Sequence, residues 1–193
     1  QRLQDVARAI GVRIREEILL PLAPTDLRTL TRKLRQAGIE PDFLLGRLLP
    51  SKDAALADGT VSTADEGTLT AKVGAIVSRV FGWTQDALFG SSPLGEPSLA
   101  AAQARFKMPA RRSRQETTVY ATYANYLAMV VHEACRELPL KPVPIGAAEF
   151  RRALIAAYGE VTLRSTLSFA WDLGVPVLPL KDKGTFHGAC WRY

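Results

Sequence analysis

The sequence is poor in the residues that most often bind metal ions or act as nucleophiles: its 193 residues include two cysteines and two histidines. No apolar run reaches the roughly 18–20 residues that a membrane-spanning helix needs. The first residues, QRLQDVARAI, lack the apolar core of a signal peptide. The spacings of phosphate-binding glycine loops and of the Gly-x-Ser-x-Gly hydrolase motif are missing as well. We therefore expect a cytoplasmic protein without a membrane segment, in which Cys135 and Cys190 are free thiols rather than a disulfide.

Each histidine precedes a cysteine by three positions, in HEAC (132–135) and in HGAC (187–190). Imidazole and thiolate are good zinc ligands, so a four-ligand zinc site is one interpretation. A spacing of three puts two side chains on one side of a helix but on opposite faces of a strand, which disfavours His187 and Cys190 as ligands of one metal. HEACR also resembles the zinc-binding His-Glu-x-x-His, but its fifth residue is Arg136, which cannot bind a metal. We predict no catalytic residue, no metal ligand and no cofactor within these residues.

What the sequence does have is an ordinary globular composition and an excess of positive charge. Hydrophobic residues make up 47% and charged residues 23%, and the net charge is +6. Such an excess favours an anionic partner such as DNA. Five basic residues and no acidic one lie in ARFKMPARRSRQ (104–115). Two interpretations of this segment stay open: a solvated hinge, or a phosphate-binding segment that uses residues such as Arg111 and Arg112.

Apolar spacing, capping residues and glycines predict a mainly α-helical chain that ends in a short β-hairpin. Helices are expected at 2–20, 27–37, 42–49, 68–81, 84–89, 116–138, 147–158 and 162–173, and strands at 175–180 and 186–193. Thr25 and Asp26 can both cap the helix at 27–37, Thr84 is the expected N-cap of the short helix after it, and Gly38 and Gly82 are the expected helix ends. Residues 50–67 lose apolar periodicity and are expected to form turns. A two-stranded hairpin is marginal alone, so further strands are expected from a longer chain or from another one.

Apolar stripes within two of the predicted helices suggest which sides are buried. In the helix at 162–173, Leu163, Leu167, Ala170 and Leu173 are expected to face one way. In the helix at 116–138, Tyr120, Tyr123 and Tyr126 could stack on nucleic-acid bases. A repeat of three along one helix is more typical of a core or contact stripe, which is the interpretation that we favour.

Three stretches resemble a known family. FAWDLGVPVLPLKDKGTFHGACWRY (169–193) resembles the segment that leads into the zinc-binding helix of the ImmA/IrrE metallopeptidases. RFKMP (105–109) and the tyrosine-rich helix after it resemble the linker of those members that carry an N-terminal helix-turn-helix domain. TLTAKVGAIVSRVFGWTQDALFG (68–90) is similar to the closing helices of a phage-repressor-type helix-turn-helix domain. The three stretches follow one another in the order that the family uses.

The resemblance implies a helix-turn-helix-like domain at 1–92, a basic linker at 93–116, and a helical region with the start of an α+β metallopeptidase-like domain at 117–193. It implies a bacterial regulatory protein whose relatives cleave a repressor, so a repressor-like protein substrate is an expected partner. The zinc helix would follow Tyr193, and zinc is expected only if the chain continues there. Gly188 and Ala189 would belong to a strand that binds an extended peptide by strand addition.

DNA contact by the first domain is expected to be non-specific. The segment that would read bases is stretched and carries Asp53 and Asp58, which weakens base recognition. The candidate DNA-binding residues are Arg32, Lys33, Arg35, Arg47, Ser51, Lys52, Arg111 and Arg112. Two further hypotheses stay open beside the peptidase one. The chain could be a stand-alone helix-turn-helix-type DNA-binding regulator, or a non-catalytic interaction module that forms a homo-oligomer.

Overall fold

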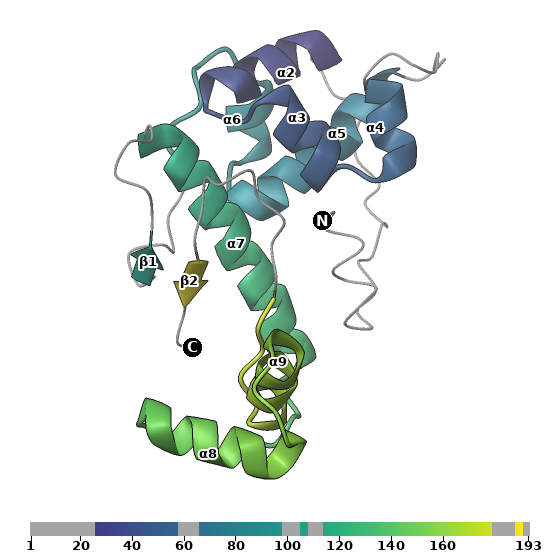
Figure 1. Ribbon diagram of the computed structural model, residues 1–193. Helices are drawn as coiled ribbons and strands as arrows, with labels where there is room; N and C mark the ends of the chain where they lie inside the picture. Colours follow the sequence, from purple (N-terminus) through teal and green to yellow (C-terminus); the bar gives the residue numbers. More distant parts are fainter. Residues whose placement is uncertain (1–25, 58–65, 98–104, 108–113, 179–187, 191–193) are drawn as a thin grey trace. The chain divides into compact units, whose positions relative to one another are not determined.

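The computed structural model describes residues 26–57, 66–97, 105–107, 114–178 and 188–190 (Figure 1). The helices are α2 (Leu27–Gln36), α3 (Pro41–Phe43), the π-helix η1 (Leu44–Leu48), α4 (Ser51–Ala57), α5 (Glu66–Phe81), α6 (Gln85–Phe89), α7 (Arg114–Ala134), α8 (Ala147–Tyr158) and α9 (Leu163–Asp172). Two short strands, β1 (Arg105–Lys107) and β2 (Gly188–Cys190), complete the elements. The described part of the chain is thus mainly α-helical, as predicted. Its helices include none that is long and apolar enough to cross a membrane.

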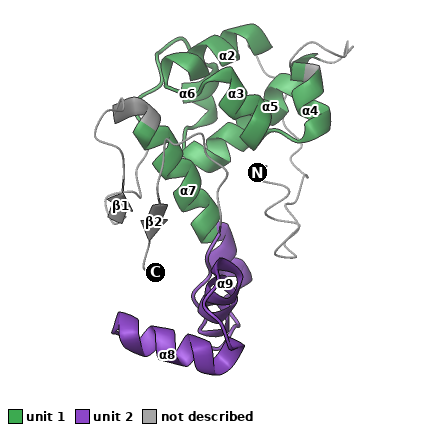
Figure 2. Ribbon diagram, in the orientation of Figure 1, with its two compact units in different colours: residues 1–129, 181–193 green, residues 130–180 purple. Residues whose placement is uncertain are grey.

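The chain divides into two compact units, and the division falls inside α7 (Figure 2). Unit 1 comprises residues 1–129 and 181–193, and unit 2 comprises residues 130–180. The predicted domain bounds at 92 and 116 stay a prediction, since much of the predicted linker lies outside the described residues. The start of α7 also belongs to unit 1, where the Tyr120 and Tyr123 rings meet the Phe43 ring edge-on, with centroids 5.0 and 5.3 Å away.

The helix boundaries of unit 1 follow from local capping chemistry. The backbone N–H of Thr29 donates to the Asp26 carboxylate at 2.6 Å, which caps α2. The same hydrogen bond is the main reason that the pKa of Asp26 is lowered. The N–H of Ala87 donates to the Thr84 hydroxyl at 3.2 Å, which caps α6. Helix α2 ends ahead of Gly38 and α5 ahead of Gly82, with positive φ at both glycines. These predicted caps and ends are confirmed.

Two segments of unit 1 differ in helical type from the expectation. The helix predicted at 42–49 begins as α3 and widens into the π-helix η1, in which the Leu49 N–H donates to the Leu44 oxygen at 3.0 Å. Residues 51–57 form α4, whereas turns were predicted. The prediction was wrong there because α4 is rich in alanine, which favours helix but gives a weak apolar pattern.

The core of unit 1 is built from one side of each of its longer helices. Helix α5 contributes Val73, Val77 and Phe81, all at most 1% exposed, and α2 contributes Leu30 and Leu34 against it. From α7, the largest buried side chains are Tyr123 and Leu127. The segment after α6 is also joined to this unit, because the indole N–H of the buried Trp83 donates to the Gly95 oxygen at 3.1 Å. This unit therefore encloses a continuous apolar interior.

Unit 2 packs α8 against α9 around a much smaller core. Its buried apolar residues are Leu154, Phe169 and Leu173, and the Phe150 ring meets Phe169 edge-on at 5.1 Å. A reciprocal capping box between Thr162 and Ser165 starts α9.

The predicted apolar face of α9 needs correction, because Leu163 is 77% exposed. Ser165, Phe169 and Leu173 are instead the buried series, at spacings of four along the helix. Leu163 is the first residue of α9 and lies outside this buried series.

The two strands pair with each other and not as the predicted hairpin. Strand β1 runs antiparallel to β2, with Phe106 opposite Ala189 and Lys107 opposite Gly188. Residues 175–178, which were expected to form the first strand of the hairpin, are irregular in the structure. The β-hairpin is therefore not confirmed. Residues 179–187, which hold the end of the first predicted strand, the connection and the start of the second strand, lie outside the described residues. The predicted helix at 2–20 lies outside them as well.

Candidate nucleic-acid interface

Three arginines form a stripe along the exposed side of α2. Arg28, Arg32 and Arg35 are spaced by four and then three residues, which brings them to one side of a helix. The opposite side of α2 buries Leu30 and Leu34. The sequence analysis had selected Arg32 and Arg35 and had missed Arg28, although the spacing alone could have added it. We call these three residues the α2 arginine stripe.

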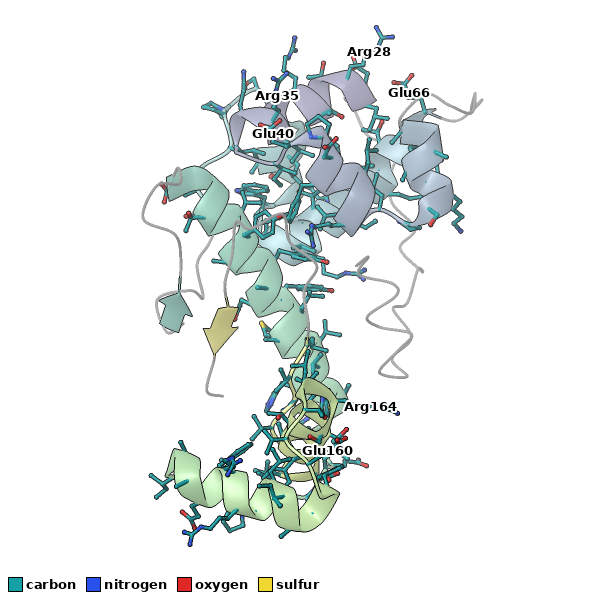
Figure 3. All side chains as sticks on the ribbon, in the orientation of Figure 1. Arg28, Arg35, Glu40, Glu66, Glu160 and Arg164 are labelled. Atoms are coloured by element: carbon teal, nitrogen blue, oxygen red, sulfur yellow. The ribbon has the colours of Figure 1, made fainter. Side chains whose placement is uncertain are left out.

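Carboxylates flank the α2 arginine stripe at both ends. At the C-terminal end, Arg35 Nε lies 3.7 Å from Glu40 Oε2 (Figure 3). Both side chains are more than half exposed, so this ion pair contributes little to stability. At the N-terminal end, the Thr29 hydrogen bonds lower the pKa of Asp26, and the charges of Arg32 and Arg28 lower it further. The stripe is accessible, but it is not a region of purely positive charge.

Lys33 is not part of this exposed surface, which corrects one of the predicted DNA contacts. The residue is 9% exposed, and its ammonium donates to the carbonyl oxygens of Ala87, Leu88 and Gly90 at 2.5, 3.3 and 2.8 Å. Those carbonyls lie at the C-terminal end of α6, where helical oxygens have no partners within the helix and a cation is favourable. Lys33 thus joins α2 to α6 and has no donor left for a phosphate.

Arg47 is held in a second interior contact. Its guanidinium carbon lies 5.4 Å from the Tyr120 ring centroid and 6.0 Å from that of Phe43, which are cation–π distances. Burial raises the pKa of the neighbouring Tyr123 to about 12, and the charge of Arg47 opposes that shift. Arg47 is half-buried and joins η1 to α7 through these contacts. Its predicted role as a phosphate contact stays a prediction.

The first turn of α4 carries the last two predicted contacts of unit 1 that the structure describes. Ser51 and Lys52 are both exposed there. Asp53 follows them but is turned inward, at 5% exposure, with its carboxylate 3.8 Å from Lys72 Nζ on α5. The acidic residue that was expected to repel DNA at this position is therefore buried in an ion pair. Asp58 lies outside the described residues.

The positive charge of the chain is unevenly distributed. Within unit 1, residues 26–57, 66–97 and 117–129 hold eight basic and seven acidic residues, so they are nearly neutral. Residues 130–178 of unit 2 hold five of each. Residues 98–116 hold five basic residues and one acidic residue, the largest excess in the chain. Arg111 and Arg112 belong to this segment and lie outside the described residues, so their predicted role stays a prediction.

The tyrosines of α7 lie in or beside the core, as the favoured interpretation had it. Tyr123 is 1% exposed, and burial also raises the pKa of Tyr126. Tyr120 contacts Phe43 and Arg47. Rings engaged in this way cannot stack on unpaired bases without unpacking α7 from η1.

The residues considered as zinc ligands do not fit a zinc site where the structure describes them. His132 is exposed on the last turn of α7, and Cys135 lies just beyond the helix end. Burial raises the pKa of the Cys135 thiol, which disfavours the thiolate that zinc requires. The described residues contain no group of three or more side chains that could hold a metal ion. The side chains of His187 and Cys190 lie outside that part of the chain.

The predicted peptide-binding residues, Gly188 and Ala189, form β2 together with Cys190. Their backbone pairs with β1 through the register given above. Pairing with β1 occupies one edge of β2, since each strand edge accepts one neighbour. Peptide addition at β2 stays a prediction.

Comparison with known proteins adds no relative. The chain matches no protein-family model, no curated protein and no solved structure.

Proposed function

We propose that the chain is the regulatory portion of a zinc peptidase of the ImmA/IrrE type, which acts in bacterial transcriptional or stress regulation. The observation that carries the proposal is the order of features after α9. The helix ends at Asp172 with Leu173 as its C-cap, and Gly174 turns the chain at φ +79°. A Val-Pro-Val segment follows, and the Gly188-Ala189 pair comes later in β2. The family uses this order before its zinc helix.

Within this proposal, the chain contributes binding and positioning and not the chemistry. Its histidines lack the His-Glu-x-x-His spacing, and the side chains that the structure describes do not fit a zinc site. Unit 1 would be a helical module that receives the regulatory partner. The β1–β2 pair would lie beside the path of a peptide from a repressor-like substrate.

The coding sequence tests this proposal most directly. We expect a His-Glu-x-x-His motif within the next few dozen codons beyond Tyr193. A stop codon immediately after Tyr193 would contradict the proposal. If the motif is present, Ala189→Pro in the complete protein is expected to weaken binding of the repressor substrate, because proline removes a strand N–H. Unchanged substrate binding by that variant would remove β2 from the proposed peptide path but leave the family assignment in place.

A second candidate function is non-specific contact with DNA phosphates. Two observations favour it: the exposed α2 arginine stripe and the basic excess of residues 98–116. Such contact does not require base recognition, which the buried position of Lys33 makes still weaker than expected. It would place the protein on DNA through charge alone.

Salt dependence tests the second candidate. We expect the full chain to bind a duplex at low salt, with the logarithm of the association constant falling linearly with the logarithm of the salt concentration. Replacing Arg28, Arg32 and Arg35 by alanine is expected to reduce that slope by about 2.7, because each phosphate that a basic residue neutralises contributes about 0.9 through the counterions it releases. The matched control replaces the exposed Arg151, Arg152 and Arg164 of unit 2 and removes the same charge. Equal slopes in the two triple variants, or no duplex binding by the unmodified chain, would contradict the candidate.

A further inference from the structure

A proline-rich segment joins α7 to α8 in unit 2. Its sequence is Leu-Pro-Leu-Lys-Pro-Val-Pro (138–144), so prolines stand at positions 139, 142 and 144. Residues 139–144 form neither helix nor strand, and all of them are exposed except Pro144, which is half-buried. We call residues 138–144 the proline segment.

The prolines restrict the backbone of almost the whole proline segment. The pyrrolidine ring holds φ at about −65° at each proline. The residue before a proline is restricted to the extended and polyproline II region, which applies to Leu138, Lys141 and Val143. Within the segment, Leu140 alone is free of both restrictions. The regular conformation that satisfies both is the polyproline II helix, which has no internal hydrogen bonds.

Contacts with the end of α9 fix one side of the proline segment. The Lys141 N–H donates to the Leu173 oxygen at 3.2 Å. Gly174 lies against Pro139 and Leu140, because an added Cβ there would be 3.0 Å from the Pro139 oxygen and 2.9 Å from Leu140 Cδ2. The segment is therefore ordered before any partner binds, which lowers the entropy cost of binding.

Pro139 and Pro142 are three residues apart, which is one turn of a polyproline II helix. With a rise of about 3.1 Å per residue, two such rings stand on the same edge of the helix, roughly 9 Å apart. This Pro-x-x-Pro spacing suits a groove that is lined by aromatic side chains. Pro144 follows Pro142 by two residues and lies off that edge.

A basic residue precedes the two prolines at the same interval. Arg136 lies three residues before Pro139, in the turn that follows α7. Its Nη1 is 3.4 Å from Glu133 Oε1, but both side chains are more than 70% exposed, so this ion pair is weak. Arg136 can therefore exchange that partner for a carboxylate of another protein, with which a guanidinium forms paired charge-assisted hydrogen bonds.

The regular spacing of Arg136, Pro139 and Pro142 indicates the kind of ligand. A membrane or a flat apolar surface would contact exposed apolar side chains whatever their spacing. An aromatic groove instead requires proline rings one polyproline turn apart, and a carboxylate at the end of the groove requires a cation beyond them. The sequence Arg-x-x-Pro-x-x-Pro (136–142) meets both requirements.

We propose that residues 136–142 are a docking motif for a partner protein of the SH3 type, whose aromatic-lined groove has acidic residues at one end. Pro139 and Pro142 enter the groove, and Arg136 pairs with the acidic residues. The proposal goes beyond the two functions given above and rests on neither of them, because it uses no residue of the α2 arginine stripe or of β2.

Binding of SH3 domains to the full chain tests the docking motif. The probes are a panel of isotope-labelled SH3 domains whose grooves are flanked by acidic residues, and the readout is the indole N–H resonance of the groove tryptophan. The unlabelled chain does not contribute to that signal. We expect saturable binding by at least one domain. Replacing Pro139 and Pro142 together by alanine is expected to weaken this binding by about tenfold or more, and Arg136→Ala by roughly fivefold.

Two substitutions are matched controls. Pro144→Ala removes a proline that lies off the docking edge, and Arg152→Ala removes an exposed arginine from α8. Each is expected to change the affinity by about twofold at most. Circular dichroism and thermal unfolding check that all variants fold.

Three results would overturn the docking motif: no saturable binding by any domain of the panel, equal losses in Pro144→Ala and in the double proline variant, or unchanged affinity in Arg136→Ala. If the double proline variant does not fold, Arg136→Glu tests the same motif, because this exposed side chain does not contribute to the core of unit 2. The reversed charge is expected to abolish binding, and retained binding would overturn the proposal.

Discussion

The two units bury their apolar side chains to very different extents. Among the described residues of unit 1, Met129 is the one large apolar side chain that is exposed. In unit 2, ten are exposed: Leu138, Leu140, Val143, Ile145, Ile155, Tyr158, Val161, Leu163, Val175 and Val177. A pair of helices has a single contact stripe on each member, so it cannot enclose a core from all sides. The difference indicates that unit 1 is stable by its own packing, whereas the surface of unit 2 is suited to further contacts.

The largest expected effect comes from removing a core leucine in each unit. Leu30→Ala in unit 1 is expected to cost about 3–5 kcal/mol, because this side chain is fully buried. Leu154→Ala is expected to unfold unit 2 while unit 1 stays folded. Urea unfolding of two single-tryptophan chains checks this, with Trp83 reporting on unit 1 and Trp171 on unit 2. The other two tryptophans, including Trp191, are replaced by phenylalanine in each chain. The comparison breaks down if either substitution shifts both transitions equally.

A buried polar contact is expected to be almost as important to unit 1 as its apolar core. Lys33→Met would leave three carbonyl oxygens at the end of α6 without their donor, at a cost of about 3 kcal/mol. The adjacent Arg32→Met removes an equal charge from an exposed position and is expected to change stability by less than about 0.5 kcal/mol. Urea unfolding followed by circular dichroism measures both variants. If Lys33→Met and Arg32→Met lost similar amounts of stability, water would be able to replace the Lys33 ammonium as the donor to these carbonyls.

Alkaline pH is expected to destabilise unit 1 through Tyr123. Burial raises the pKa of this phenol from 10.0 to about 12, so the folded state holds the proton more tightly than the unfolded state. The resulting stability is complete below pH 10 and is lost between pH 10 and 12, to an extent of roughly 2 kcal/mol. Tyr123→Phe is expected to remove this part of the pH dependence. Tyr158→Phe tests unit 2 separately, because the hydrogen bond that Tyr158 donates to Asp172 also raises the pKa of that phenol. The prediction fails if the unmodified chain and Tyr123→Phe lose stability in parallel above pH 10.

Three glycine-to-alanine variants of unit 2 are expected to have smaller effects on its stability. At Gly174, both the φ of +79° and contacts of 2.9 and 3.0 Å with Leu140 and Pro139 oppose a Cβ, and about 2 kcal/mol is expected. Gly159 has φ +76° but open space, so about 1 kcal/mol is expected. Gly146 has neither restriction, but it is the N-cap of α8, where glycine is preferred over alanine, so a loss of about 0.5 kcal/mol is expected. Thermal unfolding ranks the three variants, and any other order would contradict the proposed contact of Leu140 with the turn.

Local chemistry made the helix boundaries predictable. Asp26 and Thr84 cap helices through their own side chains, and Gly38 and Gly82 adopt the positive φ that ends a helix. These devices act over three or four residues, so sequence alone specifies them. The π-helical turn at η1 had no such local signal, and it was read as ordinary helix.

Tertiary packing determines which basic residues of the candidate interface are exposed, and the sequence alone did not reveal this. Lys33 carries the same positive charge as its neighbours Arg32 and Arg35. It differs from them in position, because it follows Leu30 by three residues and is adjacent to Leu34. That spacing places it on the apolar side of α2, a signal that charge counting overlooked. Its acceptors come from residues more than fifty positions away, which no local pattern reveals. Leu163 was misassigned because the apolar spacing did not show that Ser165, a polar residue, lies on the buried side of α9.

The π-helix η1 bears on how the chain tolerates changes in length. A π-helical turn accommodates one residue more than an α-helical turn. Gly46 lies in this turn, is exposed, and has open space around its Cα. Its deletion would let Pro41–Leu48 close as ordinary α-helix. A deletion inside α5 would instead rotate every later side chain by about 100° away from the core. In a scan that deletes single codons of unit 1, we therefore expect the tolerated helical deletion to lie in the π-helix η1.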